Sequence, residues 1–182
     1  AIHITGADSV TITGSDFTDN VASRSAGAVA IVSSRSVTLS TSDFTTNISG
    51  GNGGALAVTD AAIIAISDVI ASSNRSNGTA TGYGGAMRLL GDEVSIVDVD
   101  LISNTTAGDG GALHLVADRA FLSNVLMESN TAAVGGGALI DSDLLDMQDI
   151  VLSLNLSLIH ISESTRLSGI SYPVFCLHIL HH

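Results

Sequence analysis

Apolar and polar residues alternate along most of the chain with a spacing of two. When the sequence is aligned on a recurring asparagine, apolar columns lie ten, eight and three residues before it. The column eight residues before reads Ile12, Leu39, Ile66, Ile96, Leu122 and Met147. A spacing of two is typical of half-buried strands and differs from the spacing of an amphipathic helix. The pattern therefore predicts many short strands and no long helix.

Two markers recur with one period. A glycine-rich motif begins at residues 26, 53, 84, 110 and 136, where it reads AGAV, GGAL, GGAM, GGAL and GGAL. The asparagine series is separated by 27, 27, 30, 26 and 25 residues and consists of Asn20, Asn47, Asn74, Asn104, Asn130 and Asn155. A unit of about 26 residues cannot bury its own apolar face, whereas stacked units can. We therefore predict an all-β solenoid, a parallel β-helix of five to six coils with about 26 residues in each.

Both markers have an expected structural role. Asparagine tolerates the left-handed backbone of a tight corner, and stacked amides can hydrogen-bond from coil to coil. We expect such a ladder to include Asn20, Asn47, Asn74, Asn104 and Asn130, and to make poor glycan acceptors of the sequons that begin at Asn47 and Asn104. The glycines allow each coil to turn tightly before its first strand, and the structural positions among them are Gly54, Gly85, Gly111 and Gly137.

Composition narrows the classes of partner. The 182 residues carry a formal charge of -12, with six arginines and no lysine, and aromatic residues make up 3%. An acidic chain with few cations and few aromatic rings is a poor match for nucleic acid or for an anionic membrane surface. No apolar run approaches the length of a membrane span, so we expect no direct membrane insertion by this segment.

The C-terminal segment differs from the repeats. Residues 156–163 read LSLIHISE, residues 164–166 read STR, and residues 170–177 read ISYPVFCL. These blocks resemble the in-frame translation of a sequencing adapter, so we interpret 156–182 as read-through and 1–155 as the repeat region of a longer protein. The excluded segment holds the one cysteine, Cys176, and four of the six histidines: His160, His178, His181 and His182. The repeat region therefore offers no disulfide and no thiol chemistry.

The alternating motifs GGA-[ILV] and F-x-x-N resemble the repeats of the chlamydial polymorphic outer membrane proteins. F-x-x-N is literal at Phe17–Asn20 and Phe44–Asn47, and later copies replace the phenylalanine with Ala71, Leu101, Met127 and Leu152. In that family the repeats form the right-handed β-helical passenger of an autotransporter adhesin. The resemblance implies a right-handed solenoid at the bacterial outer membrane surface or outside the cell. There it would bind a host-cell or environmental ligand, protein or glycan, without a cofactor.

The stretch GDGGALHL, residues 108–115, combines glycines with Asp109 and His114. Other copies place Ser25, Asn52, Tyr83 and Gly135 where Asp109 stands, so we interpret Asp109 as a turn residue. His114 alternates with Leu113 and Leu115, which predicts an outward, exposed side chain whose replacement by alanine is nearly silent. Its expected neighbours in the stack are Ala30, Ala57, Arg88 and Ile140. We predict no catalytic residue in this stretch.

One polar column contains carboxylates that could bind a cation. Six residues before each asparagine come Gly14, Thr41, Asp68, Asp98, Asn124 and Asp149, with Asp100 two residues after Asp98. Strict alternation would turn this position inwards, unless a corner lies nearby and turns it out. On adjacent coils, about 4.8 Å apart, these carboxylates would repel one another unless solvated or bridged by a cation. We favour a solvated acidic strip, with Asp68, Asp98 and Asp100 as a weaker candidate for Ca²⁺.

Two functions remain open at this stage. A stalk or adhesin would bind through its flat outer faces and through the longest turn, RSNGTATGY at residues 75–83. The alternative is a polysaccharide-active β-helix, a glycoside hydrolase or lyase, that uses the aspartate column. The short turns and the scarcity of Arg and aromatic residues favour the adhesin, because an enzyme needs loops that converge on a cleft.

Overall fold

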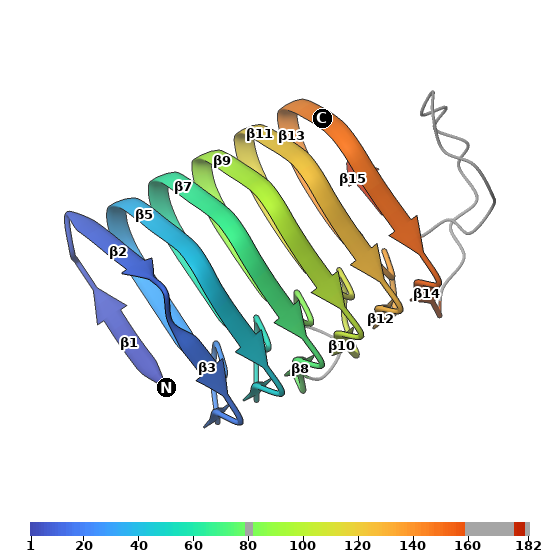
Figure 1. The fold of residues 1–182 in the computed structure, drawn as a ribbon, viewed down its shortest axis with the longest axis horizontal. Coiled ribbons are helices and arrows are strands. Elements are labelled where there is room, and N and C mark those ends of the chain that lie inside the picture. Colours follow the sequence, from blue (N-terminus) through green and yellow to red (C-terminus); the bar gives the residue numbers. More distant parts are fainter. Residues whose placement is uncertain (79–81, 159–176, 181–182) are drawn as a thin grey trace.

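The computed structural model describes residues 1–78, 82–158 and 177–180, and every regular element among them is a strand. The strands follow one another in about six stacked coils, which together form an elongated parallel β-solenoid (Figure 1). Val29 pairs with Leu56, for example, so that residues 27 positions apart are neighbours. The predicted all-β parallel β-helix is therefore confirmed.

Two sheets run along the solenoid, and all their strand pairs are parallel. The larger sheet contains β1 (Ile2–Thr5), β2 (Ser9–Thr13), β3 (Asp16–Thr18), β5 (Val29–Thr45), β7 (Leu56–Ser72), β9 (Met87–Ile102), β11 (Leu113–Glu128), β13 (Ala138–Ser153) and β15 (Leu177–Leu180). The smaller sheet contains β4 (Val21–Ala22), β6 (Ile48–Ser49), β8 (Arg75–Ser76), β10 (Thr105–Thr106), β12 (Thr131–Ala132) and β14 (Leu156–Ser157). Each two-residue strand closes one coil.

Single residues with a left-handed backbone turn the chain at the corners. The aspartate column is one such corner, with φ between 51° and 56° at Gly14, Thr41, Asp68, Asp98, Asn124 and Asp149. A second corner directly precedes the asparagine column, at Asp19, Thr46, Ser73, Ser103, Ser129 and Leu154. A third, at Gly6, Ser33 and Asp60, has no left-handed counterpart in later coils, where the register shifts by one residue after Val58. A left-handed backbone costs a non-glycine residue about 1 kcal/mol, so the stacked contacts must offset it at each corner.

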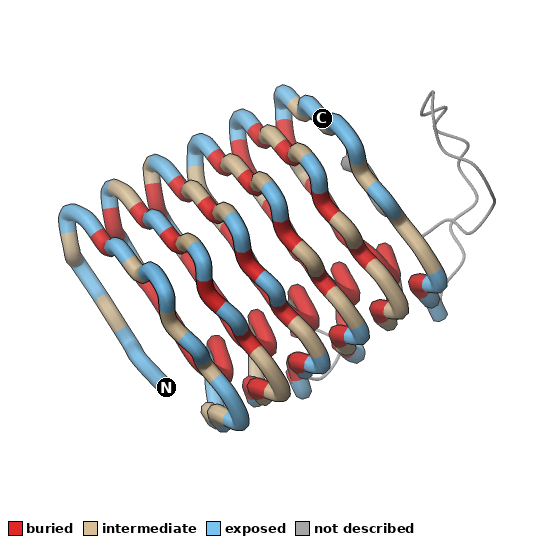
Figure 2. The backbone as a smooth tube through the Cα atoms, in the orientation of Figure 1, coloured by how far each residue is buried: buried red, intermediate tan, exposed pale blue. Residues whose placement is uncertain are grey.

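The core is the column of apolar side chains that the sequence pattern predicts. Ile66, Ile96 and Leu122 are at most 2% exposed, and buried positions recur on the inner side of every central coil (Figure 2). The rings of Phe17 and Phe44 stack at a centroid distance of 4.8 Å. Full burial of a Leu or Ile side chain contributes about 1.5–3 kcal/mol, so this column is the main source of stability.

The last glycine motif lies one residue earlier than the sequence alignment placed it. Leu113 pairs with Ala138, and Gly135 has the left-handed backbone that Gly110 has in the preceding coil. Gly136 therefore occupies the structural position assigned to Gly137, and that assignment was wrong. By the same shift Leu139, and not Ile140, is the neighbour of His114. The sequence hides this slip, because Gly136 and Gly137 precede the alanine and match the motif, whereas Gly135 and Gly136 occupy its place in the coil.

The ladder of short strands extends past residue 155, since β14 pairs with β12. Strand β15 pairs with Ala138–Asp141 of β13. His160, Cys176, His181 and His182 lie outside the described residues, and the interpretation of 156–182 as adapter sequence stays a prediction. A search of the described residues for a helix long and apolar enough to cross a membrane finds none.

Candidate functional site

The recurring asparagines form a hydrogen-bonded ladder along one corner. The Nδ2 of Asn47 donates to Oδ1 of Asn74 at 3.0 Å, and the backbone nitrogen of Asn47 donates to the same oxygen at 2.9 Å. The Nδ2 of Asn74 also donates to the carbonyl oxygen of Phe44 at 2.9 Å. The pattern repeats through Asn104 and Asn130 to Asn155, and Asn47 to Asn130 are at most 1% exposed. The ladder is therefore a structural element, and its sequon amides are occupied in the folded chain.

The glycine motifs are required by close backbone contact. A Cβ on Gly54 would lie 2.0 Å from the carbonyl oxygen of Gly85, and one on Gly111 would lie 1.8 Å from that of Gly136. Gly27 and Gly85 meet the next coil in the same way. No side chain can occupy such a position without displacing the backbone, so these glycines belong to the scaffold.

The stretch GDGGALHL contributes His114 to a covered cluster on the outer side of β9 and β11. Here the glycine turn folds back over the strand that follows it, and Tyr83 of the preceding coil bridges to Asp109. His114 points to the outer side, yet it is only 8% exposed, because the ring of Tyr83 lies 4.5 Å from its own. Arg88 lies beside it with Cζ 5.5 Å from the Tyr83 centroid. The prediction of an exposed His114 was therefore wrong, since alternation sets its direction but the turn decides its burial.

Burial also decides the chemistry of this cluster. Burial, and after it the nearby positive charge of Arg88, together lower the pKa of His114 from 6.5 to about 4. Burial likewise lowers the pKa of Arg88. Nδ1 of His114 and Nε of Arg88 have no hydrogen-bond partner among the described residues. His114 is thus neutral at physiological pH, enclosed and without a bound carboxylate, which is unsuited to general acid–base catalysis.

The aspartate column lines a shallow groove of about 460 Å³ at its corner. The left-handed backbone turns Asp68 and Asp98 outwards into solvent, and Oδ1 of Asp98 accepts a hydrogen bond from Nδ2 of Asn124 at 2.6 Å. Asp100 lines the same groove, together with Asp16 and Asp43. Among the described residues no group of three or more His, Cys, Asp or Glu is arranged to hold a metal ion. The geometry therefore gives the Ca²⁺ hypothesis no support.

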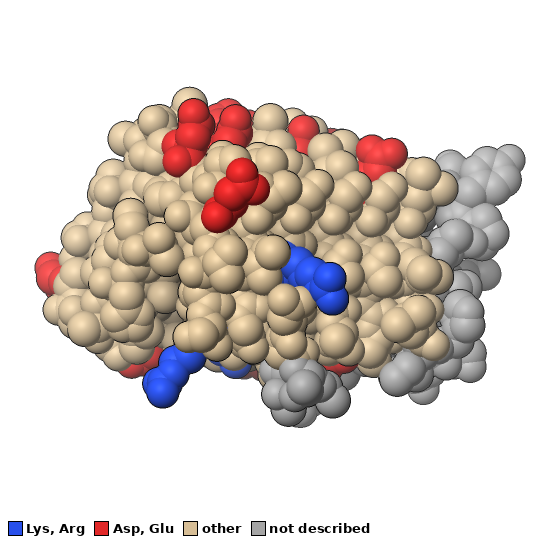
Figure 3. Space-filling view, turned by 90° about the horizontal axis from the view of Figure 1, so that it is seen from below, with Lys and Arg blue, Asp and Glu red and all other residues tan. Residues whose placement is uncertain are grey.

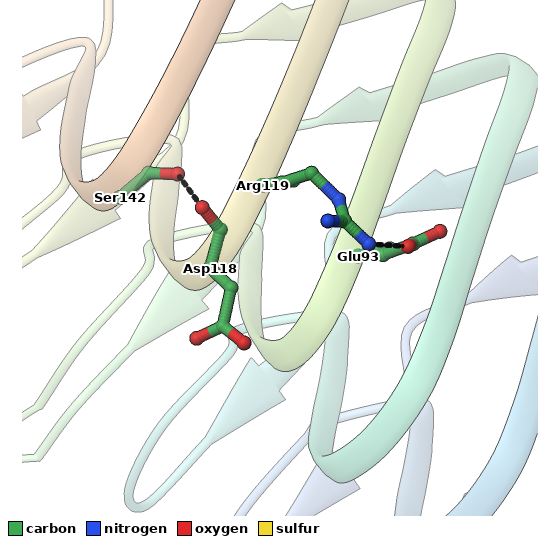
Figure 4. Close-up of polar contacts among 4 residues, drawn as sticks. All are labelled: Glu93, Asp118, Arg119 and Ser142. Carbon is green, nitrogen blue, oxygen red and sulfur yellow. Dashed lines mark hydrogen bonds and ion pairs between the residues drawn. The ribbon is translucent and has the colours of Figure 1, made fainter.

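Two further grooves were not predicted from the sequence. One, of about 510 Å³, lies on the outer face of β7, β9, β11 and β13, where Ile63, Phe121 and Leu144 flank small side chains. Arg119 crosses this face and forms an ion pair with Glu93 of the adjacent coil (Figure 4). Such a groove arises from differences in side-chain size between coils, and a repeat alignment records only the shared pattern.

The other groove, of about 780 Å³, lies along the corner that β5 and β7 turn with an extra residue. Its lining includes Asp60 and a column of carboxylates one coil apart, Asp92, Asp118 and Asp143. On the face seen in Figure 3 the acidic side chains lie mainly along one edge, and uncharged side chains cover most of the rest. On that face the negative charge is thus concentrated along one edge (Figure 3).

Comparisons of the chain with protein-family models, with curated proteins and with solved structures found no match. The functional argument therefore rests on the geometry of this chain.

Proposed function

We propose that this solenoid is a binding scaffold, the stalk and adhesin-type passenger of a surface-exposed or secreted protein that attaches cells to a surface ligand. The observation that carries the proposal is the groove on the outer face of β7, β9, β11 and β13, to which four successive coils contribute. An open groove shared by stacked repeats suits an extended ligand, and repeat proteins commonly bind along such surfaces. The resemblance of the motifs to adhesin passengers agrees with this role and with a location at the outer membrane surface or outside the cell.

The lining of the outer groove suits a protein or glycan ligand. Ile63 and Leu144 are 47% and 63% exposed. The half-buried Phe121 pairs with charged Asp146 of the next coil and follows charged Arg119 by two residues on its own strand. Apolar surface next to polar groups that fix orientation is the usual composition of a recognition site. A neutral ligand is favoured, because an anion would meet a chain of charge -12 and the one Arg in this groove is already paired with Glu93.

A polysaccharide-active enzyme is the second candidate. It is favoured by the groove that gathers Asp68, Asp98 and Asp100. Hydrolysis requires one carboxyl group that donates a proton and is shielded from water, together with a second that acts as base or nucleophile. Asp68 and Asp98 are exposed in the described structure and therefore unshielded from water, so binding without turnover is the better supported function.

An array of surface glycans and matrix proteins tests the proposal against this alternative. The protein should bind a subset of the array, and Ile63→Ser should weaken binding more than Ile70→Ser. Ile70 is a matched control, because it is 44% exposed and lines the acidic groove instead. Release of reducing ends from mixed polysaccharides, abolished by Asp98→Asn, would establish the enzyme and contradict the scaffold.

A further inference from the structure

The sequence Asn-Gly occurs twice in the turns that precede the glycine motifs, at Asn52–Gly53 and at Asn77–Gly78. Glycine leaves the backbone nitrogen after asparagine unhindered and able to approach the side-chain amide. The two pairs have the same local sequence chemistry, so any difference in their reactivity must come from the fold.

The fold holds both reacting groups of the first pair. The Oδ1 of Asn52 accepts a hydrogen bond from the backbone nitrogen of Tyr83 at 3.1 Å. The backbone nitrogen of Gly53 donates to the carbonyl oxygen of Tyr83 at 2.8 Å. Gly53 is buried and packs against the carbonyl of Leu56. Attack within this pair requires both bonds to Tyr83 to break first.

Gly78 of the second pair is buried as Gly53 is, so the two glycines differ in their hydrogen bonds and not in burial. The backbone nitrogen of Asn77 donates to the carbonyl oxygen of Ser49 at 2.8 Å, which anchors the residue to the coil before it. Its side chain is exposed. Within the described part of the chain, neither the Asn77 amide nor the Gly78 nitrogen forms a hydrogen bond. The ladder asparagines differ, since their amides are buried and bonded.

We propose that Asn77 is a site of self-modification by deamidation, with water as the co-reactant. The backbone nitrogen of Gly78 attacks Cγ of Asn77, the C–N bond of the side-chain amide breaks, and ammonia leaves with the proton from the Gly78 nitrogen. The product is a five-membered succinimide. Water then opens the ring at either carbonyl and leaves aspartate or isoaspartate at position 77. One water is consumed and one ammonia is released, with no oxidation or reduction.

The modification alters the base of the longest turn. It adds one negative charge to a chain that carries -12. Isoaspartate also lengthens the main chain at a tightly packed point, where an added Cβ on Gly78 would lie 2.7 Å from the Cα of Gly82. Tyr83 directly follows Gly82, and its ring covers His114. Displacement of Gly78 and Gly82 would therefore loosen the cover over the Arg88–His114 cluster.

Peptide mapping by mass spectrometry after incubation of the full chain at mildly alkaline pH tests the proposal. Conversion at Asn77 should exceed conversion at Asn52 by about tenfold or more, which corresponds to about 1.4 kcal/mol of barrier. Isoaspartate should be detected in the peptide that contains position 77, and Asn77→Gln should abolish that signal.

The same measurement in urea is the matched control, because it removes the fold and keeps the sequence. The two asparagines should then react at similar rates. Equal rates in the folded protein, or a faster reaction at Asn52, would overturn the proposal. So would a folded chain that leaves Asn77 intact while the unfolded chain converts.

Discussion

His114 gives the fold a pH dependence that one substitution should remove. Its pKa is about 4 in the folded chain, while an unfolded histidine has a pKa near 6.5. The unfolded chain therefore binds this proton more readily, so the folded state loses stability as pH falls from about 6.5 towards 4. Above about 6.5 both states are neutral and the residue contributes no pH dependence. Linkage gives a loss of about 2 kcal/mol between about pH 7.5 and about pH 5.

The substitution that isolates this effect is His114→Leu. Leu139 occupies the same position one coil later and is 7% exposed, so a leucine side chain fits beneath this surface. The change also removes a buried Nδ1 that has no hydrogen-bond partner in the described structure. Alanine would instead leave a gap under the ring of Tyr83, so His114→Ala is not expected to be silent.

Urea unfolding followed by circular dichroism at several pH values measures the effect. The difference in unfolding free energy between His114→Leu and the unchanged chain should grow by about 2 kcal/mol from about pH 7.5 to about pH 5. Carboxylates titrate in both proteins and cancel from this difference. For His3→Leu, at an exposed position, the corresponding difference from the unchanged chain should not grow between these pH values. A difference that is the same at both pH values would refute the burial of a neutral histidine.

Three substitutions test the scaffold by the same unfolding assay. Asn104→Ala removes two donated and two accepted bonds and leaves the backbone nitrogen of Asn74 without its acceptor. It should cost about 3 kcal/mol, against less for Asn20→Ala at the ladder's exposed end. Gly111→Ala places a Cβ 1.8 Å from the Gly136 oxygen and should cost several times more than Gly6→Ala, where no atom lies within 4 Å. Ile96→Asp puts an unpaired charge in the core and should unfold the solenoid, and a folded variant would contradict the assigned core column.

The sequence predicted those features that repeat locally. The column containing Ile66 and Ile96 and the asparagine ladder each recur in every coil, so the period alone places them. The burial of His114 could not be predicted, because it depends on the path of the turn that carries Tyr83. The groove around Phe121 was missed for a related reason, since it depends on how one coil differs from the next.

The aspartate column shows how far alternation alone predicts the direction of a side chain. Alternation alone would place Asp68 and Asp98 inside, and only a corner could turn them out. The structure has that corner, because each aspartate itself adopts the left-handed backbone that makes the turn. Asp and Asn tolerate this conformation better than other non-glycine residues, so their recurrence at this position was the signal of a corner.

The claim on which the others depend is that equivalent residues stack one coil apart along a single solenoid. Thr38 and Asp146 are 108 residues apart in the sequence and both are exposed, yet the register Thr38–Ala65–Ser95–Phe121–Asp146 places them four coils apart on one face. Spin labels at these two positions, in a chain with Cys176→Ser, can be measured by double electron–electron resonance. The account predicts a narrow distribution centred near about 19 Å, four times the strand spacing. A broad distribution extending well beyond that distance would contradict the solenoid.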